Sequence, residues 1–177
     1  MKIIVCGLNG AGKSTVGKAL AERLGFPFRD IEDYYFPHGG DYKYRSSRTR
    51  EDVAALLLGD LMQLENVVLA SVKGDYGSEV EKQFTHAVYL AVPQDIRLVR
   101  VRARAYGQFG ERIYPGGDLY EREEGFFRMV RDRTEAHVKD WLDRLSLRVI
   151  TVDGTQSAEA VAEKIAEALI LSPDRNI

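Results

Sequence analysis

Eight residues near the start of the chain have the types and spacing of a phosphate-binding loop. The segment 7–14 reads GLNGAGKS, a complete G-x-x-x-x-G-K-S pattern, between an apolar run at 2–6 and a helical pattern at 15–24. This strand–loop–helix context makes the pattern a P-loop, in which Lys13 can reach the β- and γ-phosphates and the Ser14 hydroxyl can ligate Mg²⁺. Glycines let the backbone N–H groups close on phosphate oxygens. We expect ATP to bind through Gly7, Asn9, Gly10, Ala11, Gly12, Lys13, Ser14 and Thr15, with Mg²⁺ as the metal.

Three carboxylates follow the next apolar segment. Asp30, Glu32 and Asp33 come after the short run 26–28, which we interpret as a strand. Ligands of an open α/β sheet bind outside the carboxyl ends of its strands, so this cluster should lie near the phosphate-binding loop. Asp30 could accept a proton from an acceptor, orient it, or serve Mg²⁺, and all three are candidates for acceptor binding. The alternative is a solvated acidic turn that caps the next segment.

Arginine replaces lysine completely between residues 97 and 133, where nine arginines occur. A guanidinium binds phosphate through two parallel donors, so this bias favours phosphate chemistry. Arg100 and Arg104 lie one turn apart on the expected helix 93–105. Arg112 lies in the segment 106–120, whose five glycines and prolines predict a mobile lid loop. The alternative is a solvent-exposed face on which arginines pair with glutamates.

A second group of arginines lies among tyrosines. Arg45, Arg48 and Arg50 occur with four tyrosines before the expected helix 51–64. Aromatic rings and guanidinium groups together suit a ring that carries an anionic group, so 34–64 is a candidate acceptor-binding region. Tyrosines at the edge of the core beside solvent-exposed arginines explain the same pattern equally well.

The rest of the chain alternates strands with helices. Apolar runs predict strands at 2–6, 26–28, 66–70, 87–92 and 147–152, and apolar stripes predict helices at 15–24, 51–64, 93–105, 121–145 and 158–169. This alternation indicates an α/β fold with a parallel sheet, and 177 residues suit a single domain covering 1–177.

Composition excludes several classes of protein. The net charge of −2 argues against a general binder of nucleic acid, and the single cysteine excludes an internal disulfide. No apolar stretch approaches 18 residues, so we expect no membrane span, and the absence of a signal peptide favours the cytoplasm. We expect a monomer or a homodimer.

Four segments resemble one family along nearly the whole chain. They are GLNGAGKS, LGFPFRDIED, PQDIRLVRVRAR and VDGTQSAEAVAEKI, and together they resemble P-loop kinases of the nucleoside monophosphate kinase and shikimate kinase group. The resemblance implies a three-layer P-loop NTPase fold with a five-stranded parallel sheet of order 2-3-1-4-5, and an Arg-rich lid. It implies that Arg100 stacks on adenine, that Arg104 contacts phosphates, and that Asp153 and Gly154 border the adenine. Shikimate kinases carry D-x-D after the second strand, whereas this chain has Asp30 and Glu32.

Two functions from different classes fit these patterns. The first is a kinase that moves the γ-phosphoryl group of ATP to a small molecule, with Lys13, Asp30, Arg104 and Arg112 as catalytic residues. A nucleoside or nucleotide acceptor is favoured over a sugar-like or antibiotic-like one. The second is a nucleotide-binding switch that acts through a protein or RNA partner. The acidic cluster and the lid favour the kinase, because a switch has less need of a lid that excludes water.

Overall fold

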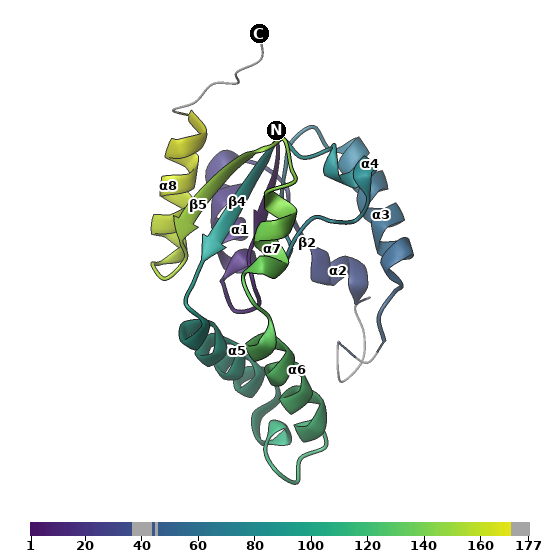
Figure 1. Cartoon of the computed structure of the whole chain (residues 1–177), viewed down its shortest axis with the longest axis vertical. Coiled ribbons are helices and arrows are strands. Elements are labelled where there is room, and N and C mark those ends of the chain that lie inside the picture. Colours follow the sequence, from purple (N-terminus) through teal and green to yellow (C-terminus); the bar gives the residue numbers. More distant parts are fainter. Residues whose placement is uncertain (37–43, 45, 171–177) are drawn as a thin grey trace.

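The computed structural model describes residues 1–36, 44 and 46–170, and its centre is a five-stranded parallel sheet (Figure 1). The strand order is β2-β3-β1-β4-β5, as the resemblance implies. The strands are β1 (Lys2–Cys6), β2 (Phe28–Asp30), β3 (Val67–Ala70), β4 (His86–Ala91) and β5 (Arg148–Asp153). Successive residues of a strand face opposite sides of the sheet, so the apolar run of β1 supplies both faces. Ile3 and Val5 face one core, and Ile4 and Cys6 face the other.

Helices cover both faces of the sheet. One face packs against α1 (Lys13–Leu24) and α8 (Ala158–Ile170). The other packs against α3 (Arg50–Gln63), the short α4 (Ser78–Glu81) and α7 (Ala136–Leu142). Trp141 of α7 is fully buried in this second core and donates its indole N–H to Glu81 of α4 at 2.9 Å. These layers fix the positions of the loops at the carboxyl ends of the strands.

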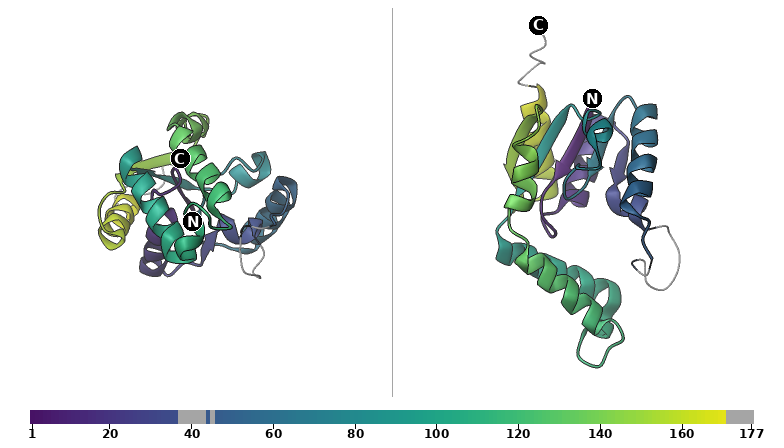
Figure 2. Two further views of the ribbon diagram at one scale, coloured as in Figure 1. Left: turned by 90° about the horizontal axis from the view of Figure 1, so that it is seen from below. Right: turned by 45° about the vertical axis from the view of Figure 1, so that its right-hand side comes forward.

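A helical arm projects beyond the carboxyl end of the sheet. It consists of α5 (Gln94–Phe109), the 3-10 turn η2 (Gly110–Ile113) and α6 (Tyr120–Asp132), and we call residues 94–132 the arm. Figure 2 shows α5 and α6 side by side and extending away from the sheet. The arm has its own hydrophobic cluster, whose buried members are Val101, Ala105, Ile113, Leu119, Phe127 and Val130.

Two predictions of the sequence were wrong at the arm. The expected helix 121–145 is two helices, α6 and α7, with a break at 133–135. Its single apolar stripe divides there, because Phe127 packs inside the arm while Trp141 packs on the sheet. The expected lid loop 106–120 begins later than predicted, since α5 continues to Phe109, whose ring packs against the arm cluster.

Smaller differences concern the acidic segment. The second strand was expected at 26–28 but runs from Phe28 to Asp30, because the Phe26 N–H is already used by Ala21 at the end of α1. A helix, α2 (Ile31–Tyr35), follows at once, with the Asp30 carboxylate capping it through the Glu32 N–H at 3.0 Å.

Candidate active site

A cavity of 1060 Å³ opens at the carboxyl ends of the strands. Its wall includes the loop 9–15, the start of α2, the loop after β3, and the facing sides of α5 and α6. The ends of β1, β2 and β3 therefore meet the arm around one space, where parallel sheets bind their ligands. The loop after β3 had no assigned role from the sequence, and the structure places Lys73, Asp75 and Tyr76 in the wall.

The phosphate-binding loop joins β1 to α1 and depends on glycine. Gly10 has φ of 83°, and a Cβ there would lie 2.4 Å from the main-chain oxygen of Arg97 on α5. No other residue fits this approach. Gly12 precedes α1 with φ of 92° and has no side chain to cap the helix. The first N–H groups of α1 can therefore serve an anion at the helix N-terminus.

Lys13 lies half-buried at the start of α1 and lines the cavity. Its Nζ donates to the main-chain oxygen of Leu8 at 3.2 Å. Burial lowers the pKa of Lys13 to about 8, and the positive charge of Arg104 lowers it further, while Glu32 and Asp30 act in the opposite direction. Several charged groups thus act on one ammonium group that can reach a bound phosphate.

Ser14 and Asp30 are in direct contact, although they are 16 residues apart. The Ser14 hydroxyl donates to Asp30 Oδ2 at 2.5 Å, and both residues line the cavity. Mg²⁺ prefers oxygen ligands and is often held by one or two protein oxygens together with substrate phosphates and water. A hydroxyl and a carboxylate beside a phosphate-binding loop fit that ion. Within the described part of the chain there is no larger cluster of His, Cys, Asp or Glu that could hold a metal.

The three arginines expected at the nucleotide differ in position. Arg104 lines the cavity from α5. Arg100 also lines it, and its guanidinium donates to the main-chain oxygens of Gly154 at 3.0 Å and Thr155 at 3.4 Å, so it joins the arm to the loop after β5. Arg112 lies outside the cavity wall. It forms a two-pronged ion pair with Asp118, at 2.9 and 2.7 Å, within the η2–α6 connection.

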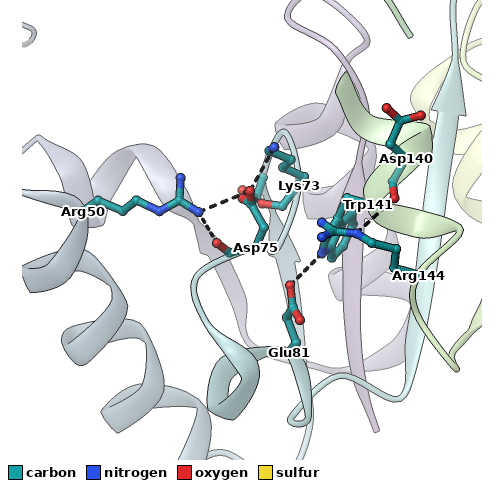
Figure 3. A network of polar contacts seen from close by, with 8 residues as sticks. Arg50, Lys73, Asp75, Glu81, Asp140, Trp141 and Arg144 are labelled. Atoms are coloured by element: carbon teal, nitrogen blue, oxygen red, sulfur yellow. Dashed lines mark hydrogen bonds and ion pairs between the residues drawn. The ribbon is translucent and has the colours of Figure 1, made fainter. Parts of the chain in front are cut away.

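Aromatic and charged side chains form another part of the cavity wall. Tyr35 of α2 lies 6.3 Å from Tyr76, measured between ring centroids, and Arg50 of α3 lies over the Tyr76 ring. Arg50 also pairs with Asp75 at 3.2 Å, and Lys73 pairs with the same carboxylate at 2.9 Å (Figure 3). This part of the wall therefore combines rings with two cations and one carboxylate.

The remaining predicted residues are divided between the wall and its surroundings. Glu32 lines the wall and accepts the Tyr44 hydroxyl at 3.2 Å, and Gly154 also lines it. Asp33 is exposed and outside the wall, and Asp153 uses its carboxylate on the N–H and hydroxyl of Thr155. Arg48 is exposed and donates to the Tyr34 carbonyl at 2.7 Å. Arg45 lies outside the described residues.

Sequence reasoning gave no individual role to several residues that line the cavity. They are Lys73, Asp75, Glu123, Arg133 and His137, and Arg50 and Arg122 line the cavity with them. Glu123 is the least expected, since it is a carboxylate with 4% exposure on α6. The third strand does not end in an acidic residue, so no motif indicates Lys73 and Asp75. Only their position after a buried strand could have indicated them.

The chain is similar to known proteins along most of its length. A family model described as an AAA domain matches residues 3–125. The uncharacterized protein YqaC of Bacillus subtilis is 28% identical over 175 residues, which cover 94% of this chain and 96% of YqaC. A shikimate kinase of Nitrosomonas europaea is 26% identical over 182 residues, covering 94% of this chain and 77% of the relative. The solved deoxyadenosine kinase from M. mycoides with bound dATP has a TM-score of 0.61 at 16% identity, covering 96% of this chain and all of its own.

The kinases among these relatives agree with a phosphate-binding loop on a five-stranded parallel sheet. The described residues contain no helix long and apolar enough to cross a membrane. The protein is a phosphotransferase that acts on a small molecule. The chain belongs to the AAA domain family, within the group of P-loop small-molecule kinases.

Proposed function

We propose that this protein transfers the γ-phosphoryl group of ATP to a nucleoside or nucleotide. The proposal depends on one observation, a continuous cavity of 1060 Å³ whose wall contains both the phosphate-binding loop and a group of rings and charged side chains. A pocket for a single drug-sized ligand measures about 300–1,000 Å³, so this cavity has room for a nucleotide and a second small molecule.

The residues near the loop would act on the phosphates. Lys13 and Arg104 would stabilise negative charge on the transferred group, as fixed positive charges do in a site that excludes water. Asp30 would keep Ser14 oriented and would hold Mg²⁺ together with it, and the ion would offset charge on the phosphates. Glu32, one residue beyond the start of α2, would face the acceptor.

The part of the cavity beside Tyr35 and Tyr76 would hold the acceptor. Tyr35 and Tyr76 supply faces on which a planar base can lie. Arg50, Lys73 and Asp75 supply donors and an acceptor for the polar edge of a base or for an anionic group. The likeness to a deoxyadenosine kinase supports a nucleoside. A hydroxy acid is the second candidate, because the Nitrosomonas europaea relative is a shikimate kinase, although Glu32 departs from the D-x-D of that group.

A product screen tests the proposal. The protein is incubated with ATP, Mg²⁺ and, one at a time, the common nucleosides, their monophosphates and shikimate, and both ADP and product mass are measured. We expect a mass increase of one phosphoryl group with a nucleoside or nucleotide. The control is Lys13→Ala, which should form no product. Phosphorylated shikimate with no phosphorylated nucleoside or nucleotide would overturn the proposed acceptor while leaving the kinase assignment intact.

A further inference from the structure

Two guanidinium groups hold a single residue of the phosphate-binding loop. Arg97, 4% exposed, donates from Nη1 to the main-chain oxygen of Asn9 at 3.4 Å and from Nε to that of Val92 at 3.1 Å. Arg133 donates from Nη1 to Asn9 Oδ1 at 3.1 Å. A guanidinium can only donate, so both oxygens of Asn9 are used to bind cations.

The two arginines mark the points where the arm joins the rest of the molecule. Arg97 lies in the first turn of α5, and its N–H bonds to the Pro93 oxygen. Arg133 directly follows the last residue of α6, at the break before α7. The loop also packs directly on α5, since the approach of Gly10 to the Arg97 backbone leaves no space for a Cβ. Both ends of the arm are therefore fastened to one loop residue.

We propose that Asn9 is the attachment point through which the arm sets the conformation of the phosphate-binding loop, and that Arg97 and Arg133 are positioning residues for nucleotide binding. Arg104 lies about two turns beyond Arg97 on the same helix. Because the first turn of α5 is held against Asn9, the position of the Arg104 backbone relative to the bound phosphates is held as well. Such pre-organisation reduces the cost of ordering these groups when a ligand binds.

The proposal rests on the proposed use of ATP, so one readout avoids the nucleotide altogether. Hydrogen exchange is followed without ligand at Gly7, Ala11 and Val16, whose N–H groups bond to Val72, Leu8 and Gly12. Variant Arg133→Ala is compared with Arg128→Ala, which removes an exposed arginine from α6. We expect exchange at these amides to rise roughly tenfold in Arg133→Ala, the effect of one charge-assisted hydrogen bond, and to stay unchanged in Arg128→Ala.

A double-mutant cycle then separates positioning from direct contact with the nucleotide. The affinity for a non-hydrolysable ATP analogue with Mg²⁺ is measured for Arg133→Ala, Asn9→Ala and the double variant. If Arg133 acts through Asn9, each single variant loses roughly tenfold in affinity and the double variant loses no more than either. Additive losses would show that Arg133 acts on the phosphates directly and would overturn the proposal.

The two readouts distinguish the possible failures. Unchanged exchange in Arg133→Ala would overturn the positioning role whether or not the protein binds ATP. If loop exchange is faster in Arg133→Ala than in the parent, but the parent binds no ATP analogue, the attachment at Asn9 stands. That result would overturn the ATP-dependent function and the role of the arginines in nucleotide binding. Thermal midpoints of all variants are compared with the parent. If Arg128→Ala lowers the thermal midpoint and raises loop exchange as much as Arg133→Ala does, the effect is a general loss of stability. That result would also overturn the proposal.

Discussion

The affinity for nucleotide should depend on pH through Lys13. Burial lowers the pKa of this ammonium to about 8 in the ligand-free protein. Phosphate oxygens beside Nζ favour the charged form, so the pKa rises in the complex and a proton is taken up on binding wherever the free residue is partly deprotonated. Affinity should be constant well below pH 8 and should fall as the pH rises above it.

The size of the effect follows from the pKa. At pH 9 about a tenth of the ligand-free protein carries the proton on Lys13, so the Kd for nucleotide should rise about tenfold, or about 1.4 kcal/mol. At pH 8 binding should take up about half a proton. The same shift has a consequence for folding. The unfolded chain keeps the ordinary pKa of 10.5, so between pH 8 and 10.5 its Lys13 binds more protons than that of the folded chain. The contribution of Lys13 therefore makes the free energy of unfolding of the ligand-free protein rise with pH in this range.

Calorimetry measures both quantities. A non-hydrolysable ATP analogue is titrated with Mg²⁺ at several values between pH 7 and 9.5, each in two buffers of different ionisation enthalpy. The control is Lys13→Met, which keeps the apolar stem and has no proton to exchange, so its weaker binding should lose this pH dependence. If the parent takes up no proton at pH 8, or if Lys13→Met keeps the same pH profile, the reasoning is wrong.

Three further changes test other parts of the site. Asp30→Asn should slow single-turnover transfer at least tenfold with little loss of ATP affinity, because the charge removed serves Ser14 and Mg²⁺. Calorimetry measures the affinity, and rapid quench measures the single-turnover rate. Gly10→Ala should abolish nucleotide binding and lower the thermal midpoint, since its Cβ would meet the Arg97 oxygen at 2.4 Å; unchanged binding would contradict this. Amides at 110–119 should exchange faster without ligand than with ATP analogue and Mg²⁺, and equal rates would exclude a lid.

The sheet and the phosphate-binding loop could be predicted from the sequence because their signals are local. The run 2–6 and the pattern GLNGAGKS determine β1 and the loop within a few residues of chain. The break at 133–135 could not be predicted, because the apolar stripe keeps its helical spacing across it. Only the presence of two separate cores, one inside the arm and one on the sheet, interrupts the helix.

The same limit applied to the candidate site. Lys13, Ser14 and Asp30 were predicted from a motif and from a strand end, and the structure brings them together. Arg112 was assigned to the phosphates from its place in a Gly-rich segment, yet it pairs with Asp118 six residues away. Which arginine faces a cavity depends on the rotation of a helix about its axis, and a run of nine arginines contains little information about that.

The separate hydrophobic cluster of the arm has a consequence for folding cooperativity. Unfolding of the arm would expose mainly its own small cluster, because among its apolar side chains Ile96 is the member that packs on a core of the sheet. Regions with few buried apolar contacts open with less free energy than the whole domain. We therefore expect a protease to cut within 94–132 before the sheet, and the population of that open form to fall when nucleotide binds. An arm that is stabilised mainly by its own cluster can also accept substitutions that would unfold a single-core domain, which leaves its sequence free to diversify while the sheet stays the same.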